Sequence, residues 1–500
     1  MDFKLKLICN LILLFTFSGD VVLRNFYFCH QKYSDICIMP LQPQIIEELQ
    51  NILGQENVLF QPEALEENST DYTEDLQFFP ECVVQPQSTV ELSKAMMIFN
   101  NYQIPVYTRG AGTGLSGACL PVKGGVVVST KKMNKIIQID SENFQVTVEP
   151  GVINAQLKLE LAKVGLYYPP DPASMGSSTI GGNIAHGAGG PKAVKYGTTR
   201  DYVLNLEVVL PTGDVIWTGA NTLKNSTGLS LTHLFVGSEG LLGIVTKAVL
   251  KLVKLPGSEL LMLAAFDNAE SCAKTVNQIL LNGFNPSGIE LMERSAIEIS
   301  SKSIQTTFPL VNNCDFYLLI VLEETKGEDL FQIAEDLFPF LEAQGAKEVF
   351  LPTNSDMQEN WWKVRRSMGT AVKQESIYKE EDTVVPRAKL PELIEGVKKI
   401  GRKYGFRSVC YGHAGDGNLH VNILKDQLTD EQWNTTVIQG IREIFQLCFQ
   451  LGGTISGEHG VGLVQKNYLD IVFTQKHLEL MKGIKQVFDP KGIMNPGKWL

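Results

Sequence analysis

Glycine is spread unevenly along this chain, and its three clusters constrain the fold more than any other feature of the sequence. Nineteen of the 44 glycines fall within residues 109–125, 176–197 and 213–243. Glycine tolerates backbone dihedrals that other residues avoid, and it lets another group approach the main chain closely. Three such clusters in one part of the chain therefore predict a large ligand that is wrapped by main chain.

The first cluster, Arg109–Gly117, lies between strand-like runs at 104–108 and 125–129. Consecutive glycine amides that turn inward form an anion-binding nest, and Thr113 and Ser116 add hydroxyl donors. The cluster contains a GxGxxG spacing. No long helix follows it, however, and no Lys-Ser/Thr pair ends it, so neither the Rossmann motif nor the nucleotide-triphosphate loop applies. The loop is typical of a pyrophosphate site, and a ligand-free glycine corner is the alternative.

The second and third clusters extend the same pattern. Residues 168–190 run from a proline-rich segment into glycines and small residues, which let a flat ring lie against the backbone. Residues 236–244 lead into another apolar strand-like run, and the alternation over 203–217 around a Pro-Thr-Gly-Asp turn predicts a hairpin. Residues 79–256 are therefore predicted to form a strand-rich domain.

The composition excludes several classes of protein. Hydrophobic residues make up 44% and charged residues 20%, which is ordinary for a globular protein with a large core. The formal net charge of -11 disfavours binding to a phosphate backbone, so we expect no nucleic-acid partner. Nine cysteines without a CxxC pair indicate a reducing compartment, and they provide no ligand run for an iron–sulfur cluster.

Residues 1–38 differ from the rest of the chain. Two lysines precede the apolar run Leu7–Phe17, which is typical of a signal peptide but too short for a membrane span. No clear cleavage site follows, and Met39 opens a segment that alternates like an amphipathic helix. We therefore hypothesise that Met39 is the physiological start, with an anchor or an export signal as the alternatives. N-terminal sequencing of the native protein distinguishes them.

Residues 258–430 alternate apolar strand-like runs with amphipathic helical stretches, which predicts a second α+β domain. Two of the seven histidines, His413 and His420, flank a Gly-Asp-Gly-Asn turn that can place them opposite each other. Glu458 follows in another glycine-rich loop. Two imidazoles and a carboxylate suit Zn²⁺, Mn²⁺ or Fe²⁺ and leave positions open for a substrate. The alternative is two unrelated histidines beside a tight turn.

In combination, these motifs resemble the FAD-binding flavoproteins of the vanillyl-alcohol oxidase and p-cresol methylhydroxylase (PCMH) superfamily. The C-terminal motifs resemble its glycolate oxidase FAD-subunit and D-lactate dehydrogenase branch, and the resemblance extends from about residue 45 to residue 500. It implies an α+β fold in which a PCMH-type FAD-binding domain is followed by an FAD-linked oxidase cap domain. The domain limits that we expect are an N-terminal extension at 1–38, a helical segment at 39–78, the FAD-binding domain at 79–257 and the cap domain at 258–500, whose tail returns to FAD.

The resemblance also implies which residues hold the cofactor. The loop before residue 119 contains no histidine, and Cys119 lies just past it, so we expect FAD to be bound non-covalently. Asn495, in the closing Asn-Pro-Gly motif, is either a flavin contact or a plain turn residue. The expected cofactor-binding residues are Arg109, Gly110, Ala111, Gly112, Thr113, Gly114, Leu115, Ser116, Gly117, Pro170, Asp171, Gly176, Ser177, Thr179, Gly181, Gly182, Asn183, Ala185, Gly189, Gly190, Glu239, Gly240, Gly243, Ile244 and Asn495.

The chemistry implied by the resemblance is the oxidation of a 2-hydroxy acid. His413, His420 and Glu458 would hold a divalent metal, and His459 would be the base that takes the hydroxyl proton. Arginine binds a substrate carboxylate bidentately, and a W-x-x-R spacing selects Arg365 over its neighbour. A solvated basic helix end is the alternative. Lys379 is a further candidate for the active site, because its strand resembles the one that crosses the active site in relatives.

We therefore expect an FAD-dependent dehydrogenase of glycolate or D-lactate. The reduced FAD would pass its electrons to a quinone, a cytochrome, a separate iron–sulfur partner subunit or oxygen, because no NAD site is evident. The alternatives are D-2-hydroxyglutarate as the substrate, or a non-catalytic FAD-carrying subunit of a complex. We expect a cytoplasmic location, with peripheral association at the inner membrane as the alternative. A homo-oligomer is a further expectation about partners.

Overall fold

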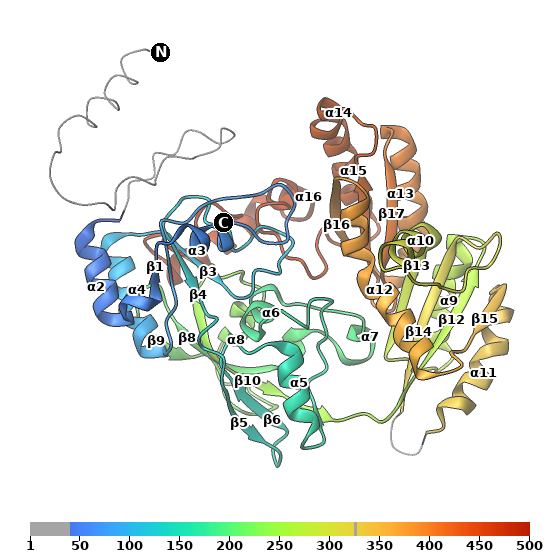
Figure 1. Cartoon of the computed structure of the whole chain (residues 1–500), viewed down its shortest axis with the longest axis horizontal. Coiled ribbons are helices and arrows are strands. Elements are labelled where there is room, and N and C mark those ends of the chain that lie inside the picture. The colour runs from blue at the N-terminus through green and yellow to red at the C-terminus, as the bar shows by residue number, and fades with distance from the viewer. Residues whose placement is uncertain (1–40, 325–327) are drawn as a thin grey trace. The chain divides into compact units, whose positions relative to one another are not determined.

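The computed structural model describes residues 41–324 and 328–500. The hypotheses about residues 1–38 and about Met39 therefore lie outside the described residues. Within the described chain, sheets and helices form two halves, one rich in the glycine clusters and one built on a single large sheet (Figure 1). The predicted α+β fold class is confirmed.

The first half contains two larger sheets whose strands are short and mostly buried. The four-stranded sheet has the order β1 (Val58–Leu59), β2 (Cys82–Val84), β4 (Val126–Ser129), β3 (Val106–Arg109), and its last two pairings are parallel. The five-stranded antiparallel sheet has the order β5 (Ile136–Asp140), β6 (Gln145–Val148), β10 (Ile244–Lys251), β8 (Val203–Val209), β9 (Val215–Trp217). The short strand β11 (Val253–Lys254) pairs with β7 (Leu166–Tyr167).

Helices cover the apolar faces of these sheets. The amphipathic helix α2 (Pro43–Leu53) buries Ile45, Leu49 and Leu53 against α4 (Thr89–Tyr102) and the four-stranded sheet. Ser88 caps α4 by accepting a hydrogen bond from the Glu91 amide, which satisfies a backbone donor that the first turn leaves unpaired. The short helix α6 (Ile180–His186) begins in the second glycine cluster and ends at Gly187, which has a positive φ of 66°. The remaining helices here are α3 (Pro62–Glu67), α5 (Asn154–Ala162), α7 (Ala193–Tyr196) and α8 (Leu231–Phe235).

The second half is built on one seven-stranded sheet, in which every pairing is antiparallel. Its strand order is β15 (Glu348–Phe350), β12 (Glu259–Phe266), β14 (Phe316–Glu323), β13 (Gly288–Glu293), β17 (Arg407–His413), β18 (Asn418–Leu424), β16 (Tyr378–Val384). Three of these strands, β16, β17 and β18, lie side by side at one end of the sheet. Their placement brings together residues that are distant in sequence.

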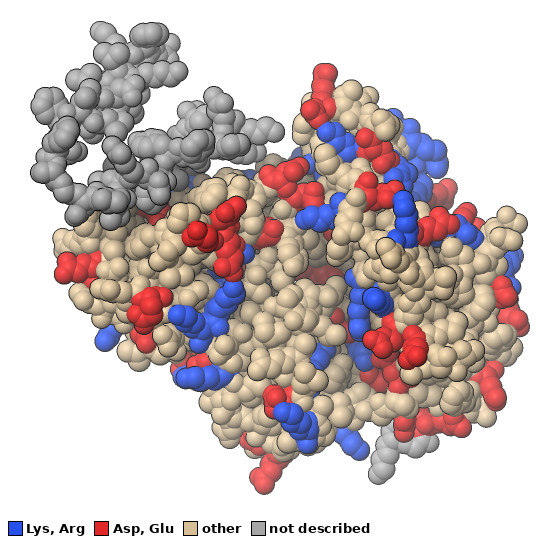
Figure 2. Space-filling view, viewed as in Figure 1, with Lys and Arg blue, Asp and Glu red and all other residues tan. Residues whose placement is uncertain are grey.

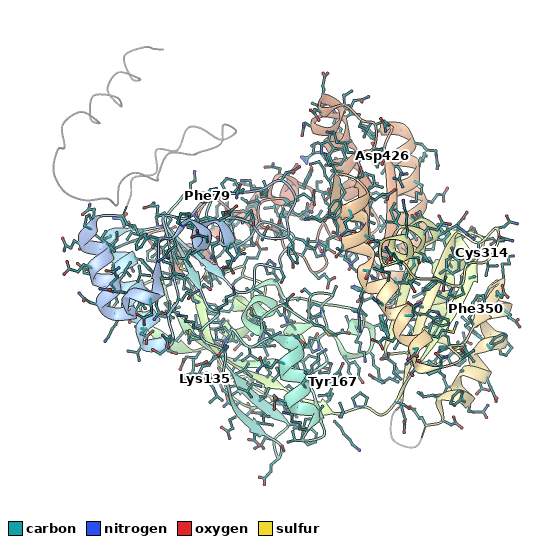
Figure 3. All side chains as sticks on the ribbon, in the orientation of Figure 1. Phe79, Lys135, Tyr167, Cys314, Phe350 and Asp426 are labelled. Atoms are coloured by element: carbon teal, nitrogen blue, oxygen red, sulfur yellow. The ribbon has the colours of Figure 1, made fainter. Side chains whose placement is uncertain are left out.

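Both faces of this sheet are covered, so the central strands β12 and β14 read as nearly continuous apolar runs rather than as a strict alternation. The core on one face includes side chains of α9 (Ala269–Leu281), α11 (Leu330–Ala343), α13 (Leu390–Tyr404) and α15 (Thr436–Gln450). The core on the other face includes α10 (Arg294–Ser303) and α12 (Ser355–Glu375). Helix α14 (Asp430–Asn434) precedes α15. Figure 3 places Cys314 and Phe350 in this half, and Lys135 and Tyr167 in the half that holds the glycine clusters.

The C-terminal segment returns to the first half. After α16 (Leu469–Val472) and α17 (Gln475–Phe488), the Val106 amide donates to the Ile493 carbonyl at 2.8 Å, and the Asn495 amide donates to the Val106 carbonyl at 2.7 Å. The residues just before the C-terminus therefore lie beside β3, where Met494 pairs with Val106 and the Tyr107 hydroxyl donates to the Pro496 carbonyl at 3.1 Å. None of the helices within the described residues is long and apolar enough to cross a membrane.

Candidate active site

A cavity of about 550 Å³ runs from the glycine clusters to the histidines of the second half. Its size falls in the range of sites for small molecules and cofactors. Main chain and small side chains dominate one end, and the titratable residues gather at the other. The predicted cofactor-binding residues that line it are Gly110, Ala111, Gly112, Thr113, Gly114, Leu115, Thr179, Gly181, Gly182, Asn183, Ala185, Glu239, Gly240, Gly243 and Ile244.

The glycines at this end bring two loops into close contact. Gly112 has a positive φ of 74°, and a Cβ there would meet the Arg109 guanidinium. A Cβ on Gly110 would meet the Thr179 hydroxyl, and one on Gly181 would lie 2.5 Å from the Pro150 Cβ. Larger side chains would therefore separate the loops or fill the cavity. A cavity that is lined at one end by glycine-rich loops fits a dinucleotide whose pyrophosphate is held by backbone donors.

Several predicted cofactor residues have structural contacts instead of lining the cavity. Arg109 is buried and donates to the main-chain carbonyls of Thr70 and Glu67 at 2.7 and 3.1 Å. The Asn495 side chain donates to the carbonyls of Ala118 and Glu239 at 2.9 and 2.7 Å, so it joins two cavity loops from behind. The others that the structure leaves outside the cavity lining are Ser116, Gly117, Pro170, Asp171, Gly176, Ser177, Gly189 and Gly190.

The histidines of the β17–β18 hairpin converge on Glu458. The ring centroids of His413 and His420 are 5.4 Å apart. The Nε2 atoms of His413 and His420 lie 3.3 and 3.6 Å from the same Glu458 oxygen, Oε1. Ligands about 2.0–2.2 Å from one ion are separated by roughly 3.0–3.6 Å, so this donor set fits a divalent metal. A second group, Glu380, His420 and His459, also has ligand atoms within 4.8 Å of one another.

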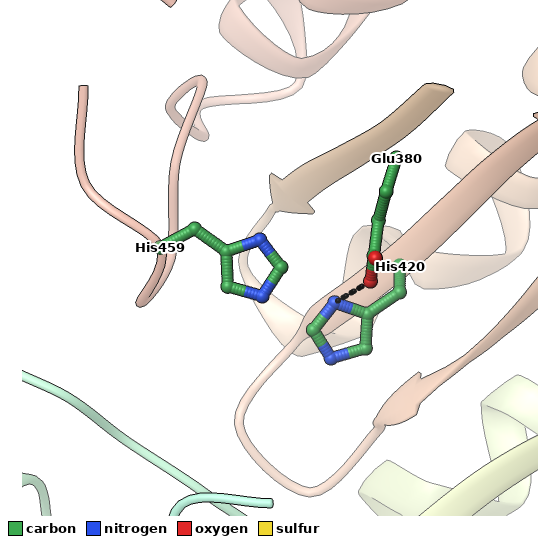
Figure 4. Close-up of side chains that lie close together, drawn as sticks. All are labelled: Glu380, His420 and His459. Carbon is green, nitrogen blue, oxygen red and sulfur yellow. Dashed lines mark ion pairs between the residues drawn. The ribbon is translucent and has the colours of Figure 1, made fainter. Parts of the chain in front are cut away.

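His459 lies beside this group on the loop that follows α15. Its ring stacks on that of His420, with centroids 5.2 Å apart and an interplanar angle of 13° (Figure 4). Its main-chain carbonyl oxygen lies 3.0 Å from Nδ1 of His186, another cavity-lining histidine. The structure thus brings the four predicted residues His413, His420, Glu458 and His459 into one wall of the cavity.

Asp382 determines where Glu458 and His459 lie. Its Oδ2 atom accepts hydrogen bonds from the main-chain amides of Gly457, Glu458 and His459, each at 2.8 Å. The Ser456 hydroxyl donates to the same oxygen at 2.9 Å. A carboxylate that accepts several backbone amides strongly favours its ionised form. Burial alone would raise the pKa of Asp382, but His459, His420 and these amides hold it well below its usual value.

Arg365 reaches the cavity from α12 and meets a carboxylate that the motifs do not contain. Its Nη2 lies 2.5 Å from Oε2 of Glu290, and its guanidinium lies over the Tyr411 ring at 5.2 Å. Glu290 has no exposed surface and also contacts Nδ1 of His413, with its two oxygens at 2.8 and 3.0 Å. Glu290 interrupts the otherwise apolar run Ile289–Met292, and this was the sequence signal for the site, because unpaired charges are rarely buried.

Lys379 is the predicted active-site residue that the structure does not bring to the cavity. Successive side chains of a strand point to opposite faces. Tyr378 and Glu380 line the cavity, whereas the Lys379 ammonium lies 5.1 Å from the centroid of the Trp433 ring. The Glu380 Oε1 atom lies 3.6 Å from Nδ1 of His420 (Figure 4). The residue of β16 that faces the cavity is therefore the acidic Glu380 and not its basic neighbour Lys379.

The titration behaviour of the cluster follows from burial and close charges. Burial, together with the imidazoles of His459 and His413, lowers the pKa of His420 to about 3. Burial alone would lower the pKa of His413, but Glu290 and Glu458 raise it well above its usual value. Burial opposes ionisation of Glu458, yet His413 and His420 hold its pKa at about 2. Asp382 and Glu380 likewise outweigh burial and raise the pKa of His459.

Solved structures share this architecture. The chain superposes on p-cresol methylhydroxylase with a TM-score of 0.75 over 91% of this chain and 96% of that one, at 20% identity. It superposes on an alkyldihydroxyacetonephosphate synthase with a TM-score of 0.72 over 93% and 88%, at 19% identity. Both likenesses show the fold alone. The chain thus has the two-domain fold of the PCMH-type flavoproteins, as expected.

Sequence comparison gives the family. Residues 80–219 match the FAD binding domain, and residues 255–499 match the C-terminal domain of FAD linked oxidases. The "Glycolate oxidase subunit GlcD" of Bacillus subtilis is 38% identical over 86% of this chain and 91% of that protein. The "D-lactate dehydrogenase" of Anaerostipes hadrus is 36% identical over 84% and 89%, and the "D-2-hydroxyglutarate dehydrogenase" of Stutzerimonas stutzeri is 32% identical over 91% and 98%. The chain belongs to the FAD-linked oxidases, and FAD is its cofactor.

Proposed function

We propose that this protein is an FAD-dependent dehydrogenase that oxidises a small D-2-hydroxy acid, glycolate or D-lactate, to the 2-oxo acid. The observation that supports the proposal best is the convergence of Arg365, His459 and the His413–His420–Glu458 set on the wall of one cavity. The three named relatives all act on acids of this kind by their names. A non-catalytic carrier of FAD would have no need for this complete constellation.

Arg365 and His459 have different roles in the proposed reaction. The Arg365 guanidinium binds the substrate carboxylate, because its planar fork pairs with a carboxylate bidentately. His459 accepts the hydroxyl proton at a ring nitrogen, and the nearby carboxylates that raise its pKa stabilise the imidazolium that forms. FAD, when bound, supplies the hydride acceptor for the C2 hydrogen.

His413, His420 and Glu458 hold a divalent cation, Zn²⁺, Mn²⁺ or Fe²⁺, in this proposal. Their two nitrogens and one oxygen suit these metals, and a bound cation would lower the pKa of the substrate hydroxyl. FAD is held non-covalently. Cys119, which lines the cavity, is no ready nucleophile, because burial raises the pKa of its thiol to about 11.

The electrons leave the flavin for a quinone, a cytochrome or an iron–sulfur partner subunit. The word "subunit" in the names of the relatives from B. subtilis and Escherichia coli supports a partner of this kind. On the face seen in Figure 2, basic and acidic side chains are interspersed rather than gathered into one basic surface.

D-2-hydroxyglutarate is the second candidate substrate. Arg366 and Lys373 also line the cavity and offer further cations for a second carboxylate. Lys373, however, pairs with Glu74 at 3.0 Å, and the Arg366 guanidinium stacks over Trp362 at 4.7 Å. Glu380 would repel a second carboxylate that approached the histidines, so we favour the shorter acids.

The test is anaerobic mixing of the purified protein with glycolate, D-lactate, L-lactate and D-2-hydroxyglutarate, while the flavin absorbance is followed. Bleaching by glycolate or D-lactate, slowed about 10²–10⁴-fold in His459→Ala, is the expected result for the loss of a general base. Removal of the metal with a chelator should also slow bleaching. Bleaching that survives the chelator would remove the metal from the proposal, and bleaching by none of the acids would refute it.

A further inference from the structure

Glu290 joins two side chains that the proposed reaction uses for different purposes. Its carboxylate contacts Nδ1 of His413 at 2.8 Å and Nη2 of Arg365 at 2.5 Å. The residue is wholly buried in β13. Removing a charged group from water costs several kcal/mol unless it is well paired, so a buried carboxylate with two such partners is held in place by both.

The contact with His413 determines which ring nitrogen faces the metal position. A carboxylate beside Nδ1 keeps the proton on that atom, so Nε2 is the nitrogen that would give up its proton to bind a cation. The Nε2 atom is the one that faces Glu458, at 3.3 Å. Glu290 therefore presents the correct nitrogen and fixes the rotation of the ring.

The contact with Arg365 fixes the position of the guanidinium that would bind the substrate carboxylate. Glu290 pairs with the guanidinium at Nη2 across 2.5 Å without hydrogen-bond geometry, and the buried Nε atom likewise has no hydrogen-bond partner within residues 41–324 and 328–500. A buried donor without a partner is costly, and a ligand oxygen can satisfy it. Arg365 lines the cavity, so this donor is available to a substrate carboxylate.

We propose that Glu290 is a positioning residue that couples the metal-binding imidazole of His413 to the carboxylate-binding guanidinium of Arg365. The proposal rests on the proposed function, since it concerns the same site. The Glu290 carboxylate orients both His413 and Arg365, so its loss should weaken the binding of the cation and of the substrate acid together. Glu290 itself contacts neither the cation nor the acid in this proposal.

Glu293 provides a matched control from the same strand. It is also buried and charge-paired, with Oε1 2.7 Å from Lys398 Nζ and Oε2 accepting the Cys410 amide at 2.9 Å. It does not line the cavity. Glu293→Gln therefore carries the same loss of a buried negative charge on β13 without touching His413 or Arg365.

The experiment uses the full-length FAD-bound protein after removal of metal with a chelator. Zn²⁺ affinity is measured by calorimetry, and steady-state kinetics are measured at saturating Zn²⁺. Glu290→Gln should weaken Zn²⁺ binding about 10–100-fold, which is typical for loss of a carboxylate behind a ligand histidine. At saturating Zn²⁺ the remaining defect should fall mainly on KM, because Arg365 is misplaced. Glu293→Gln should stay within about threefold of wild type on both measures.

Glu290→Asp is the second variant, because it keeps the buried charge beside Arg365 even if Glu290→Gln fails to fold. A shorter carboxylate cannot reach both partners, so its Zn²⁺ affinity and KM should lie between those of wild type and Glu290→Gln. Wild-type Zn²⁺ affinity and KM in a folded Glu290 variant would overturn the proposal, as would an equal loss in Glu293→Gln or no Zn²⁺ binding by wild type. If no acid reduces the flavin of wild type, the proposed function fails, while the Zn²⁺ comparison still tests Glu290.

Discussion

At the scale of single residues, alternation along β16 separates two neighbouring charges. Glu380 faces the cavity and His420, whereas Lys379 lies over Trp433 on the other side of the strand. The motif around this strand could locate the segment but not the side chain, because one residue of offset reverses the face.

The assignment of faces predicts different effects for the two substitutions. Glu380→Gln should change the rate of flavin reduction by at least tenfold, because it removes a charge beside His420. Lys379→Met should change it less than about threefold, because an exposed or half-buried pair far from the chemistry contributes little. Stopped-flow reduction by the preferred acid compares the two. A larger effect of Lys379→Met would place that side chain in the site after all.

Buried Glu381, on the same strand, makes stability depend on pH. Burial raises the pKa of its carboxyl from 4.5 to about 7, despite a hydrogen bond from Gln465. A group whose folded-state pKa is raised stabilises the fold below its unfolded pKa, and this contribution is lost as the pH rises through the folded value. The free energy of unfolding should therefore fall between about pH 4.5 and pH 7.

The neutral isostere Glu381→Gln isolates this effect. The variant should be more stable than wild type at pH 8, by up to about 3 kcal/mol, and should match wild type near pH 4.5. Unfolding temperatures measured across this range test the prediction. An equal difference between the two proteins at both pH values would contradict it.

At the scale of elements, the glycine loops do not contribute equally to the cofactor site. Gly112 combines a positive φ of 74° with a cavity position, so a side chain there strains the backbone and displaces Arg109. Gly176 is exposed and lies outside the cavity lining, and a Cβ added to it would have no other atom within 4 Å. The sequence pattern had nevertheless grouped Gly176 with the glycines that line the cavity.

Gly112→Ala should accordingly lose FAD, because the loop amides cannot keep their positions. The ratio of flavin to protein after gel filtration should fall severalfold, while Gly176→Ala should retain the wild-type ratio. Equal retention by both variants would show that the 110–114 main chain does not hold the cofactor.

At the scale of the whole molecule, the C-terminal tail fastens the cofactor loops from behind. Buried Lys498 donates to the carbonyls of Gly117 and Leu120 at 2.9 and 2.5 Å, and Asn495 joins Ala118 to Glu239. The tail therefore connects loops that are about 120 residues apart. Its packing should accordingly affect the stability of the whole first half.

Lys498→Met should lower the unfolding temperature and weaken FAD retention. Two buried carbonyls lose a charged donor, which costs about 1–3 kcal/mol for each group left unsatisfied. Lys491→Met is the control, because Lys491 is exposed and donates to the Asn100 carbonyl at 3.0 Å. Thermal melts with and without added FAD measure both effects, and equal melts for the two variants would argue against the tail's role.

The sequence by itself predicted the classes of element, a ligand wrapped by glycine-rich main chain and the grouping of His413, His420 and Glu458, because glycine clusters, alternation and a hairpin turn are properties of neighbouring residues. The resemblance to a known family added FAD and His459 to this prediction. Tertiary structure alone decided that Glu290 and Asp382 support this set, and that Glu380 rather than Lys379 faces it. These contacts join strands and loops far apart in the chain. They depend on sheet order and strand face, which local residue patterns do not encode.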